Sequence, residues 1–235
     1  MYSVCSVVSP LIIAHRGVSA EKPENTLAAF RRALALDVDG IELDVRVTRD
    51  GVAVVFHDDT LRRLTGTGGR VAGQTWAELR LLRVHGREPI PRLVDVLRLT
   101  RGLAVVQIEL KSGPVAATVR AIKAARAAEW VILASFDPRL VAEARQLAPA
   151  IPRLLISEGR AAPAWLVRRL AAIGASGLSV DQRAVRSAAW VRHFHMRGYA
   201  VWAWTVNDPA VARRLAGWGV NALLGDDPAL LKSGV

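Results

Sequence analysis

Three apolar runs of the sequence end in ionisable residues whose types could bind a cation and a phosphate. The residues at these ends are His15-Arg16, Glu42-Leu43-Asp44 and Glu109-Leu110-Lys111. Side chains two positions apart in a strand lie on one face, so Glu42 and Asp44 are expected to point the same way. Charges inside a fold need partners or a metal, so these three ends mark a candidate site.

The segment after Asp44 is expected to bring a histidine back to these carboxylates. It reads VRVTRDGVAVVFHD, two alternating runs on either side of Asp50-Gly51, a dipeptide favoured in two-residue hairpin turns. With that turn, Arg49 pairs with Val52, and Asp44 lies directly opposite His57 with Cβ atoms roughly 4.5–5.5 Å apart. The hairpin is then an insertion after the second strand, and a register shift of one residue would turn His57 away.

These residues suit a cation site with an acid and a base beside it. Glu42, Asp44 and Glu109 would supply only oxygen ligands, which favour one divalent cation, Mg²⁺ or Ca²⁺ (or Mn²⁺), over zinc. His15 and His57, with an ordinary pKa of about 6.5, suit a general base and a general acid near neutral pH. We assign His15 as the base and His57 as the acid.

Two basic residues at the same strand ends suit a phosphate. Arg16 offers a forked guanidinium and Lys111 a point charge. Together with the cation site they predict metal-assisted phosphoryl transfer, in which the cation offsets negative charge on the phosphoryl oxygens.

Short β-rich runs alternate with helix-period segments along the chain, which is typical of βα units around a parallel sheet. In residues 26–36, for example, Leu27, Phe30 and Leu34 repeat at helical spacing. The eight expected strands are residues 11–15, 40–45, 104–110, 131–135, 152–156, 177–180, 200–206 and 221–225.

Eight parallel strands with intervening helices predict an α/β fold, a (β/α)8 TIM barrel with a small β-hairpin insertion after the second strand. A doubly wound open sheet would need a glycine-rich phosphate loop after the first strand, where only Gly17 stands. Asp-Pro pairs at Asp137, Asp208 and Asp227 offer an N-cap carboxylate and a proline for the helices that follow. We expect residues 1–235 to form a single domain, with loops and one short helix within 60–90.

Composition excludes several classes of protein. With 51% apolar and 23% charged residues, the chain is neither disordered nor of low complexity. The one cysteine, Cys5, cannot form an internal disulfide, so the fold does not depend on an oxidising compartment. The sequence lacks the apolar run of about 18 residues that a transmembrane segment needs, and its start lacks a basic leader and a cleavage pattern. We interpret this start as the first strand of a cytoplasmic protein.

The net charge of +11 comes from 28 Arg and 4 Lys against 21 acidic residues. Such a charge could attract nucleic acid, an anionic membrane surface or a phosphorylated substrate. The basic residues are scattered, however, and their longest runs are pairs such as Arg62-Arg63. A generally basic surface is therefore the favoured interpretation, and no dedicated nucleic acid site is expected.

At these residues the sequence resembles the glycerophosphodiester phosphodiesterases. A single one of the shared motifs would be a weak signal, but here they occur in order over nearly the whole chain. They are HRG at 15–17, PENT at 23–26, GIELDVRVTRDGVAVVFHDDTL at 40–61, ELK at 109–111, WTVN at 204–207 and GVNALLGDDP at 219–228.

The resemblance implies a TIM barrel that cleaves the phosphodiester of a deacylated phospholipid into glycerol 3-phosphate and an alcohol. It implies the same site as the residues themselves: cation ligands Glu42, Asp44 and Glu109, acid/base histidines His15 and His57, and phosphate contacts from Arg16 and Lys111. A substrate hydroxyl could attack first and give a cyclic phosphate, by analogy with the phosphoinositide-specific phospholipases C.

Trp204 and Glu24 each allow both a functional and a purely structural interpretation. In the family, Trp204 packs near the glycerol moiety, but Trp202 and Trp204 at a spacing of two are also typical of a core. Glu24 supports the active site in the family, yet Glu24 and Asn25 could simply start the helix that follows, with Asn25 as its cap.

Alternative functions also stay open at this point. The same site could serve a lysophospholipase D or a phosphoinositide-type phosphodiesterase. From a different class, the chain could be a non-catalytic basic protein that binds a polyanion. The sequence indicates neither the alcohol released nor the oligomeric state.

Overall fold

Eight parallel strands close into a barrel in the computed structural model, which describes residues 9–235. The first strand, β1, pairs with β2 on one side and with β11 on the other, so the sheet closes on itself. The predicted TIM barrel is confirmed. Its strands are β1 (Leu11–Ala14), β2 (Gly40–Val47), β6 (Val105–Leu110), β7 (Val131–Ser135), β8 (Arg153–Ser157), β9 (Gly177–Asp181), β10 (Ala200–Trp204) and β11 (Ala222–Gly225).

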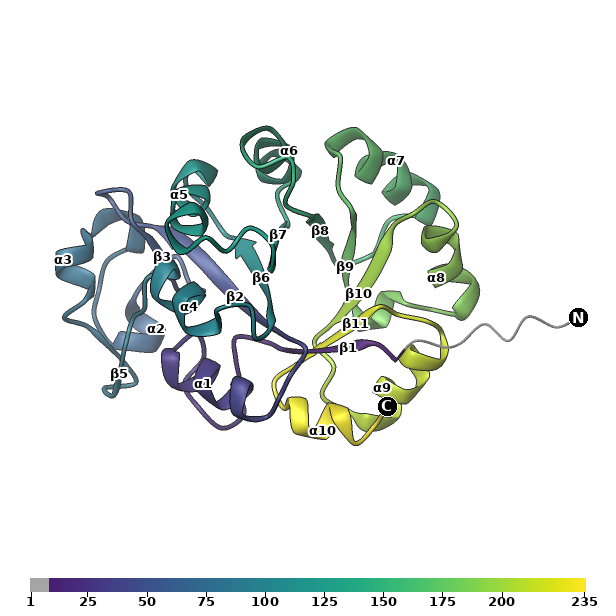
Figure 1. Ribbon diagram of the computed structural model, residues 1–235, viewed down its shortest axis with the longest axis horizontal. Helices are drawn as coiled ribbons and strands as arrows, with labels where there is room; N and C mark the ends of the chain where they lie inside the picture. Colours follow the sequence, from purple (N-terminus) through teal and green to yellow (C-terminus); the bar gives the residue numbers. More distant parts are fainter. Residues whose placement is uncertain (1–8) are drawn as a thin grey trace, which may run out of the picture.

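Helices lie in a ring around these strands, one after each strand-to-helix connection (Figure 1). The Asp-Pro pairs work as expected: Asp137, Asp208 and Asp227 each accept a backbone N–H in the first turn of the next helix, with proline at its start. The helices of the ring are α1 (Leu27–Ala35), α4 (Leu93–Thr100), α5 (Val115–Ala125), α6 (Pro138–Leu147), α7 (Pro163–Ile173), α8 (Ala188–His195), α9 (Pro209–Gly217) and α10 (Pro228–Lys232).

All eight predicted strands are present, and their ends differ from the predicted ends by at most two residues. The largest differences are at β2, which ends at Val47 rather than at residue 45, and at β10, which ends at Trp204 rather than at residue 206. The apolar start of the chain is also expected to join the first strand, but residues 1–8 lie outside the described part. β1 begins at Leu11, the first residue of the predicted range 11–15. In residues 9–235, no helix is long and apolar enough to cross a membrane.

The inserted segment between β2 and α4 lies at one side of the barrel (Figure 1). It holds its own small core, in which Val54, Phe56, Leu61 and Leu79 are buried together. This stretch contains more structure than the loops and single helix expected from the sequence. Its elements are β3 (Ala53–Val55), α2 (Arg62–Thr65), a 3-10 turn at Val71–Gly73, α3 (Trp76–Leu79), β4 (Arg83–Val84) and β5 (Glu88–Pro89).

The predicted register of the β2–β3 hairpin is wrong by one residue. Val45 pairs with Val55 and Val47 with Ala53, so the position opposite Asp44 belongs to Phe56 and not to His57. The cause is the turn. Gly51 donates its N–H to the carbonyl oxygen of Thr48 and has a φ of 79°, which makes a three-residue loop with a left-handed third residue in place of the two-residue turn.

Candidate active site

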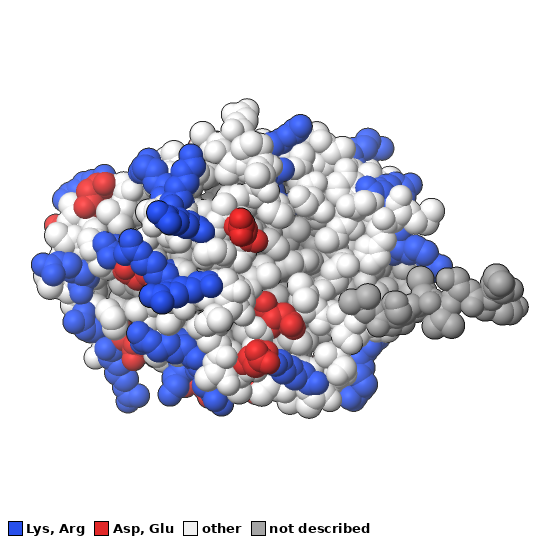
Figure 2. All heavy atoms as spheres, in the orientation of Figure 1, with Lys and Arg blue, Asp and Glu red and all other residues white. Residues whose placement is uncertain are grey.

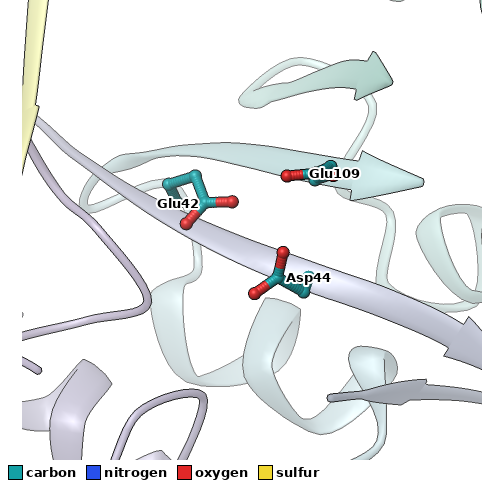
Figure 3. Close-up of side chains that lie close together, drawn as sticks. All are labelled: Glu42, Asp44 and Glu109. Carbon is teal, nitrogen blue, oxygen red and sulfur yellow. The ribbon is translucent and has the colours of Figure 1, made fainter. Parts of the chain in front are cut away.

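Three buried carboxylates meet at the carboxyl ends of β2 and β6. One oxygen atom from each of Glu42, Asp44 and Glu109 lies within 4.8 Å of the others. The parallel register places Asp44 beside Glu109, and alternation along β2 puts Glu42 on the same face. Figure 3 shows the three side chains pointing into one space between the two strands. The structure thus brings together the three predicted cation ligands.

Two basic side chains lie against this cluster and partly neutralise it. The Lys111 ammonium is 2.6 Å from an oxygen of Glu109 and 3.1 Å from one of Asp44. The Arg16 guanidinium is 3.3 Å from the other Asp44 oxygen. Burial disfavours the charged form of Asp44, but Lys111 and Arg16 outweigh it and hold the pKa of Asp44 below its ordinary value.

The other two carboxylates are less well compensated. Burial, followed by the negative charge of Asp44, raises the pKa of Glu42 to about 8. The same two causes raise the pKa of Glu109, against the opposing effect of Lys111. A group of three carboxylates with this excess of negative charge, and with oxygen as its only donor type, fits a divalent cation such as Mg²⁺ or Ca²⁺.

His15 is held by a carboxylate from the last strand-end loop. Its Nδ1 atom lies 2.7 Å from an oxygen of Asp226, which also accepts hydrogen bonds from Ser19 and Asn207. Because a carboxylate only accepts, Nδ1 carries the hydrogen and Nε2 is the atom that faces away from Asp226. That atom is 4.0 Å from a Glu42 oxygen.

His57 is held in the same way by its neighbour in the chain. Its Nδ1 atom lies 2.7 Å from Asp58, whose two oxygens accept from Arg63. Arg63 also donates two hydrogen bonds to Glu24, which accepts another from Arg16. A series of side chains of alternating charge, Asp58, Arg63 and Glu24, therefore connects His57 to Arg16. His57 reaches the site although the predicted pairing with Asp44 is wrong, because the chain leaves the hairpin ladder after Phe56.

The two histidines differ in pKa. Burial lowers the pKa of His15, but the hydrogen bond to Asp226 and the charge of Glu42 outweigh it, so the net direction is upward. Burial lowers the pKa of His57, and Asp44 and Asp58 offset only part of this. The pKa of His15 therefore lies above that of His57.

Asn25 binds Asp44 and is not the cap of α1. Its side-chain amide donates to an Asp44 oxygen at 2.8 Å, and its carbonyl oxygen accepts from the Asp44 backbone N–H at 3.2 Å. The cap is Thr26, whose hydroxyl accepts from the N–H of Ala29. The expectation that Asn25 caps the helix is therefore wrong.

One cavity of about 170 Å³ joins most of the predicted residues. Phe136 and Trp204 form its aromatic wall, with ring centroids 5.7 Å apart and planes at 76°. Asp44 lies behind the lining, and Glu24 lines a neighbouring hollow that shares His15 and Arg16. The cavity is lined by His15, Arg16, Glu42, His57, Gln107, Glu109, Lys111, Phe136, Ile156, Ser179, Trp204, Thr205 and Leu224.

The basic residues show no single binding stripe on the face in view. In Figure 2, Lys and Arg lie mainly around the outline of this face, most densely over the side of α4 and α5, and acidic side chains interrupt them near the centre. This distribution agrees with the generally basic surface expected from the sequence.

Comparison with known proteins identifies relatives over most of the chain. The model of the "Glycerophosphoryl diester phosphodiesterase family" matches residues 15–230. A "Glycerophosphodiester phosphodiesterase" from Caldanaerobacter subterraneus subsp. tengcongensis is 34% identical over 94% of this chain and 96% of its own.

Solved structures of relatives have the same fold. A phosphodiesterase from Oleispira antarctica, in complex with the product sn-glycerol-3-phosphate, superposes with a TM-score of 0.87 at 30% identity and covers 96% of each chain. A glycerophosphodiester phosphodiesterase from Thermotoga maritima gives a TM-score of 0.82 at 26% identity, over 96% of this chain and 98% of that one.

Proposed function

The chain belongs to the glycerophosphoryl diester phosphodiesterase family, and on that premise we propose that it cleaves glycerophosphodiesters with two histidines and one divalent cation, giving glycerol 3-phosphate and an alcohol. It is a phosphoric diester hydrolase. The observation that carries the proposal is the meeting of three buried carboxylates within 4.8 Å, beside a cavity that is lined by two of them, Glu42 and Glu109, and by both histidines. A non-catalytic polyanion-binding protein would need none of these groups.

The cavity offers separate places for phosphate and for glycerol. Arg16 and Lys111 line it beside the carboxylates, and we assign them as phosphate ligands because guanidinium and ammonium groups pair with phosphate oxygens. Trp204 lines its aromatic wall, against which the carbon atoms of glycerol can pack. The Oleispira antarctica relative is described in complex with glycerol 3-phosphate, which supports this choice of substrate.

Glu42, Asp44 and Glu109 would hold the cation, with Mg²⁺ or Ca²⁺ as the expected ion. Such an ion supplies stabilisation of the negative charge that develops on the phosphoryl oxygens. Asn25 contributes by fixing the Asp44 carboxylate through two hydrogen bonds.

The histidines move the protons. Nε2 of His15 accepts the proton of an attacking water as the water oxygen bonds to phosphorus, which gives glycerol 3-phosphate directly. His57 donates a proton to the oxygen of the departing alcohol as the second phosphorus–oxygen bond breaks. If a hydroxyl of the substrate attacks in place of water, the product of this step is a cyclic phosphate, and a water molecule opens it in a second step with the two histidines in exchanged roles. Asp226 and Asp58 hold the two rings with Nε2 available for these transfers.

A product-resolved assay tests this function. Purified protein is incubated with glycerophosphocholine, glycerophosphoethanolamine and lysophosphatidylcholine, with added Mg²⁺ or Ca²⁺ and with a chelator. We expect glycerol 3-phosphate from the first two substrates, and loss of turnover on chelation that the cation restores. Turnover of lysophosphatidylcholine alone would indicate a lysophospholipase D, and full activity in chelator would contradict the cation site.

We also propose a cytoplasmic location. It is supported by the single cysteine, since the fold needs no disulfide. Cell fractionation followed by an immunoblot tests it, and recovery of the protein outside the cytoplasm would contradict it.

A further inference from the structure

Three buried polar atoms of uncharged residues in the cavity have no hydrogen-bond partner among residues 9–235. They are Oε1 of Gln107, Oγ of Ser179 and Nε1 of Trp204. Gln107 is 2% exposed and Ser179 is fully buried, and both residues line the cavity of the candidate active site. Buried polar groups in native proteins are almost always paired, so these atoms point to a hydrogen-bonding ligand.

Gln107 and Ser179 each stand one inward-facing place before a residue at the rim of the site. Gln107 stands two positions before Glu109 on β6, so it occupies the next inward-facing place towards the strand's start. Ser179 pairs with Trp202 in the register of β9 and β10, one inward place before Trp204. Apolar side chains, Trp202 beside Ser179 among them, fill the barrel interior around these positions. Gln107 lies beside Glu42 in the register of β2 and β6, so the uncharged polar side chains form a layer that borders the carboxylates on one side and the apolar interior on the other.

The chemistry of this layer indicates what it binds. Ser179 and Trp204 come from β9 and β10, across the barrel from the strands that carry Glu42 and Glu109. The layer offers an amide oxygen that accepts, an indole N–H that donates and a hydroxyl that does both. A neutral group with hydroxyls matches all three, and the residues that line the cavity include no carboxylate from β9 or β10 that could pair with a cationic amine.

We propose that Gln107 and Ser179 determine specificity by binding the hydroxyl of the glycerol arm that lies farthest from phosphorus. This inference rests on the proposed function. The phosphate then lies among the charged groups, the glycerol carbons pack on Trp204, and the other alcohol leaves towards the open hollow that shares His15 and Arg16. A site built to pair with a hydroxyl rejects the analogue that lacks it.

The test compares two substrates across matched variants. Glycerophosphocholine is paired with propane-1,2-diol 1-phosphocholine, which keeps the hydroxyl next to the phosphoester and lacks the distal one. Variants Gln107→Met and Ser179→Ala remove the polar atoms with little change in volume. Ser135→Ala is the control, because this buried serine on β7 donates to the Leu110 carbonyl oxygen and does not line the cavity.

We expect the wild type to prefer glycerophosphocholine by about tenfold or more in kcat/KM, and each variant to lose most of that preference. The loss should come from the glycerol substrate, with turnover of the analogue changing by less than about twofold. The control should keep the full preference. Melting temperatures should hold or rise in the two variants, because each removes an unpaired polar atom.

The outcomes separate this inference from the proposed function. If the wild type hydrolyses both substrates without preference, or if a variant slows both substrates equally, the inference is overturned and the function stands. If the wild type hydrolyses neither substrate but cleaves bis(p-nitrophenyl) phosphate, the proposed function fails and the inference with it.

Discussion

Each histidine in the cavity has a carboxylate on Nδ1, at 2.7 Å in both cases. The two carboxylates have different anchors. Asp226 is bonded by Ser19 and Asn207, whereas Asp58 is bonded by Arg63. The pair at His57 therefore depends on a charged network and the pair at His15 on neutral hydrogen bonds. Only the ring orientation is common to both, which is what two proton transfers on opposite sides of one phosphate require.

The assignment of His57 as the acid predicts that a leaving group that needs no proton restores the activity of a His57 variant. Replacing His57 with Ala should lower kcat on glycerophosphocholine by about 10²–10⁴. On glycerophospho-p-nitrophenol the same variant should recover most of its rate, because the nitrophenolate leaves without a proton. His15→Ala is the matched control and should stay slow on both substrates. Rescue of His15→Ala in place of His57→Ala would reverse the order of base and acid.

Asn25 should affect cation binding indirectly, through the Asp44 carboxylate that it positions. Its φ of 59° is left-handed, so Asn25→Gly keeps the backbone conformation and removes only the two hydrogen bonds to Asp44. We expect the concentration of Mg²⁺ needed for half-maximal activity to rise about 10–100-fold.

Saturating Mg²⁺ should then restore much of the Asn25→Gly activity, because the three carboxylates remain. Asn25→Gly with an unchanged Mg²⁺ requirement would show that Asp44 needs no such support.

Sequence reasoning found the site residues that stand at the ends of apolar strand runs. Glu42 and Asp44 are two positions apart on one strand, and alternation alone puts them on one face. Asp226 stands 211 positions from His15 in the chain, so only the closed barrel brings them together. Asp58 gave a nearer signal, since it directly follows His57, but a lone acid beside a histidine is common in loops.

At the scale of elements, the hairpin shows how a local signal can mislead. Asp50-Gly51 does mark the turn, but the dipeptide fits both a two-residue turn and a three-residue loop with glycine in third place. In the structure, Thr48 accepts from Gly51 N–H and its hydroxyl bonds to Asp50, which favours the longer loop. Core packing of Val54 and Phe56 then sets the register, and that packing is not visible in the turn sequence.

The longer loop predicts a specific cost at Gly51. Its φ of 79° is left-handed, and open space surrounds the place of an added Cβ apart from one Arg120 nitrogen at 3.6 Å. Gly51→Ala should therefore lower the free energy of unfolding by about 1–2 kcal/mol through backbone strain alone.

Gly73→Ala is the control, because nothing lies within 4 Å of its added Cβ and its φ is not left-handed. Urea unfolding followed by circular dichroism measures both. Equal stability of the two variants would argue against the three-residue loop.

At the scale of the whole molecule, barrel closure brings carboxylates from distant segments to one rim. Strand boundaries were predictable because each run is apolar, short and followed by a helix signal, as at β11 and Asp227. The hydrogen-bond and ion-pair partners of the site residues were not predictable, because they depend on which loops meet once the barrel has closed. Glu24, Asp58 and Asp226 all lie in such loops and all have a pKa below the ordinary value.

These lowered pKa values predict acid sensitivity, and Asp226 allows it to be measured. Burial disfavours its charge, but hydrogen bonds from His15 and Asn207 outweigh this and lower its pKa from 3.8 to about 2. The unfolded chain therefore takes up this proton at a higher pH than the folded chain. The stabilisation is present above about pH 4 and is lost as the pH falls towards 2.

Urea unfolding of the wild type and of Asp226→Asn, from pH 6 down to pH 2, tests this directly. At pH 6 the variant should be less stable by no more than about 1 kcal/mol, because the Asp226 side chain is 35% exposed and such pairs are screened by water. The difference in the free energy of unfolding should close as the pH falls, because protonation of Asp226 removes the negative charge that the substitution has already removed from the variant. Glu129→Gln, which changes an exposed carboxylate before β7, should run parallel to the wild type. A gap that stays constant with pH would mean that Asp226 stabilises the rim through hydrogen bonds that do not depend on its charge.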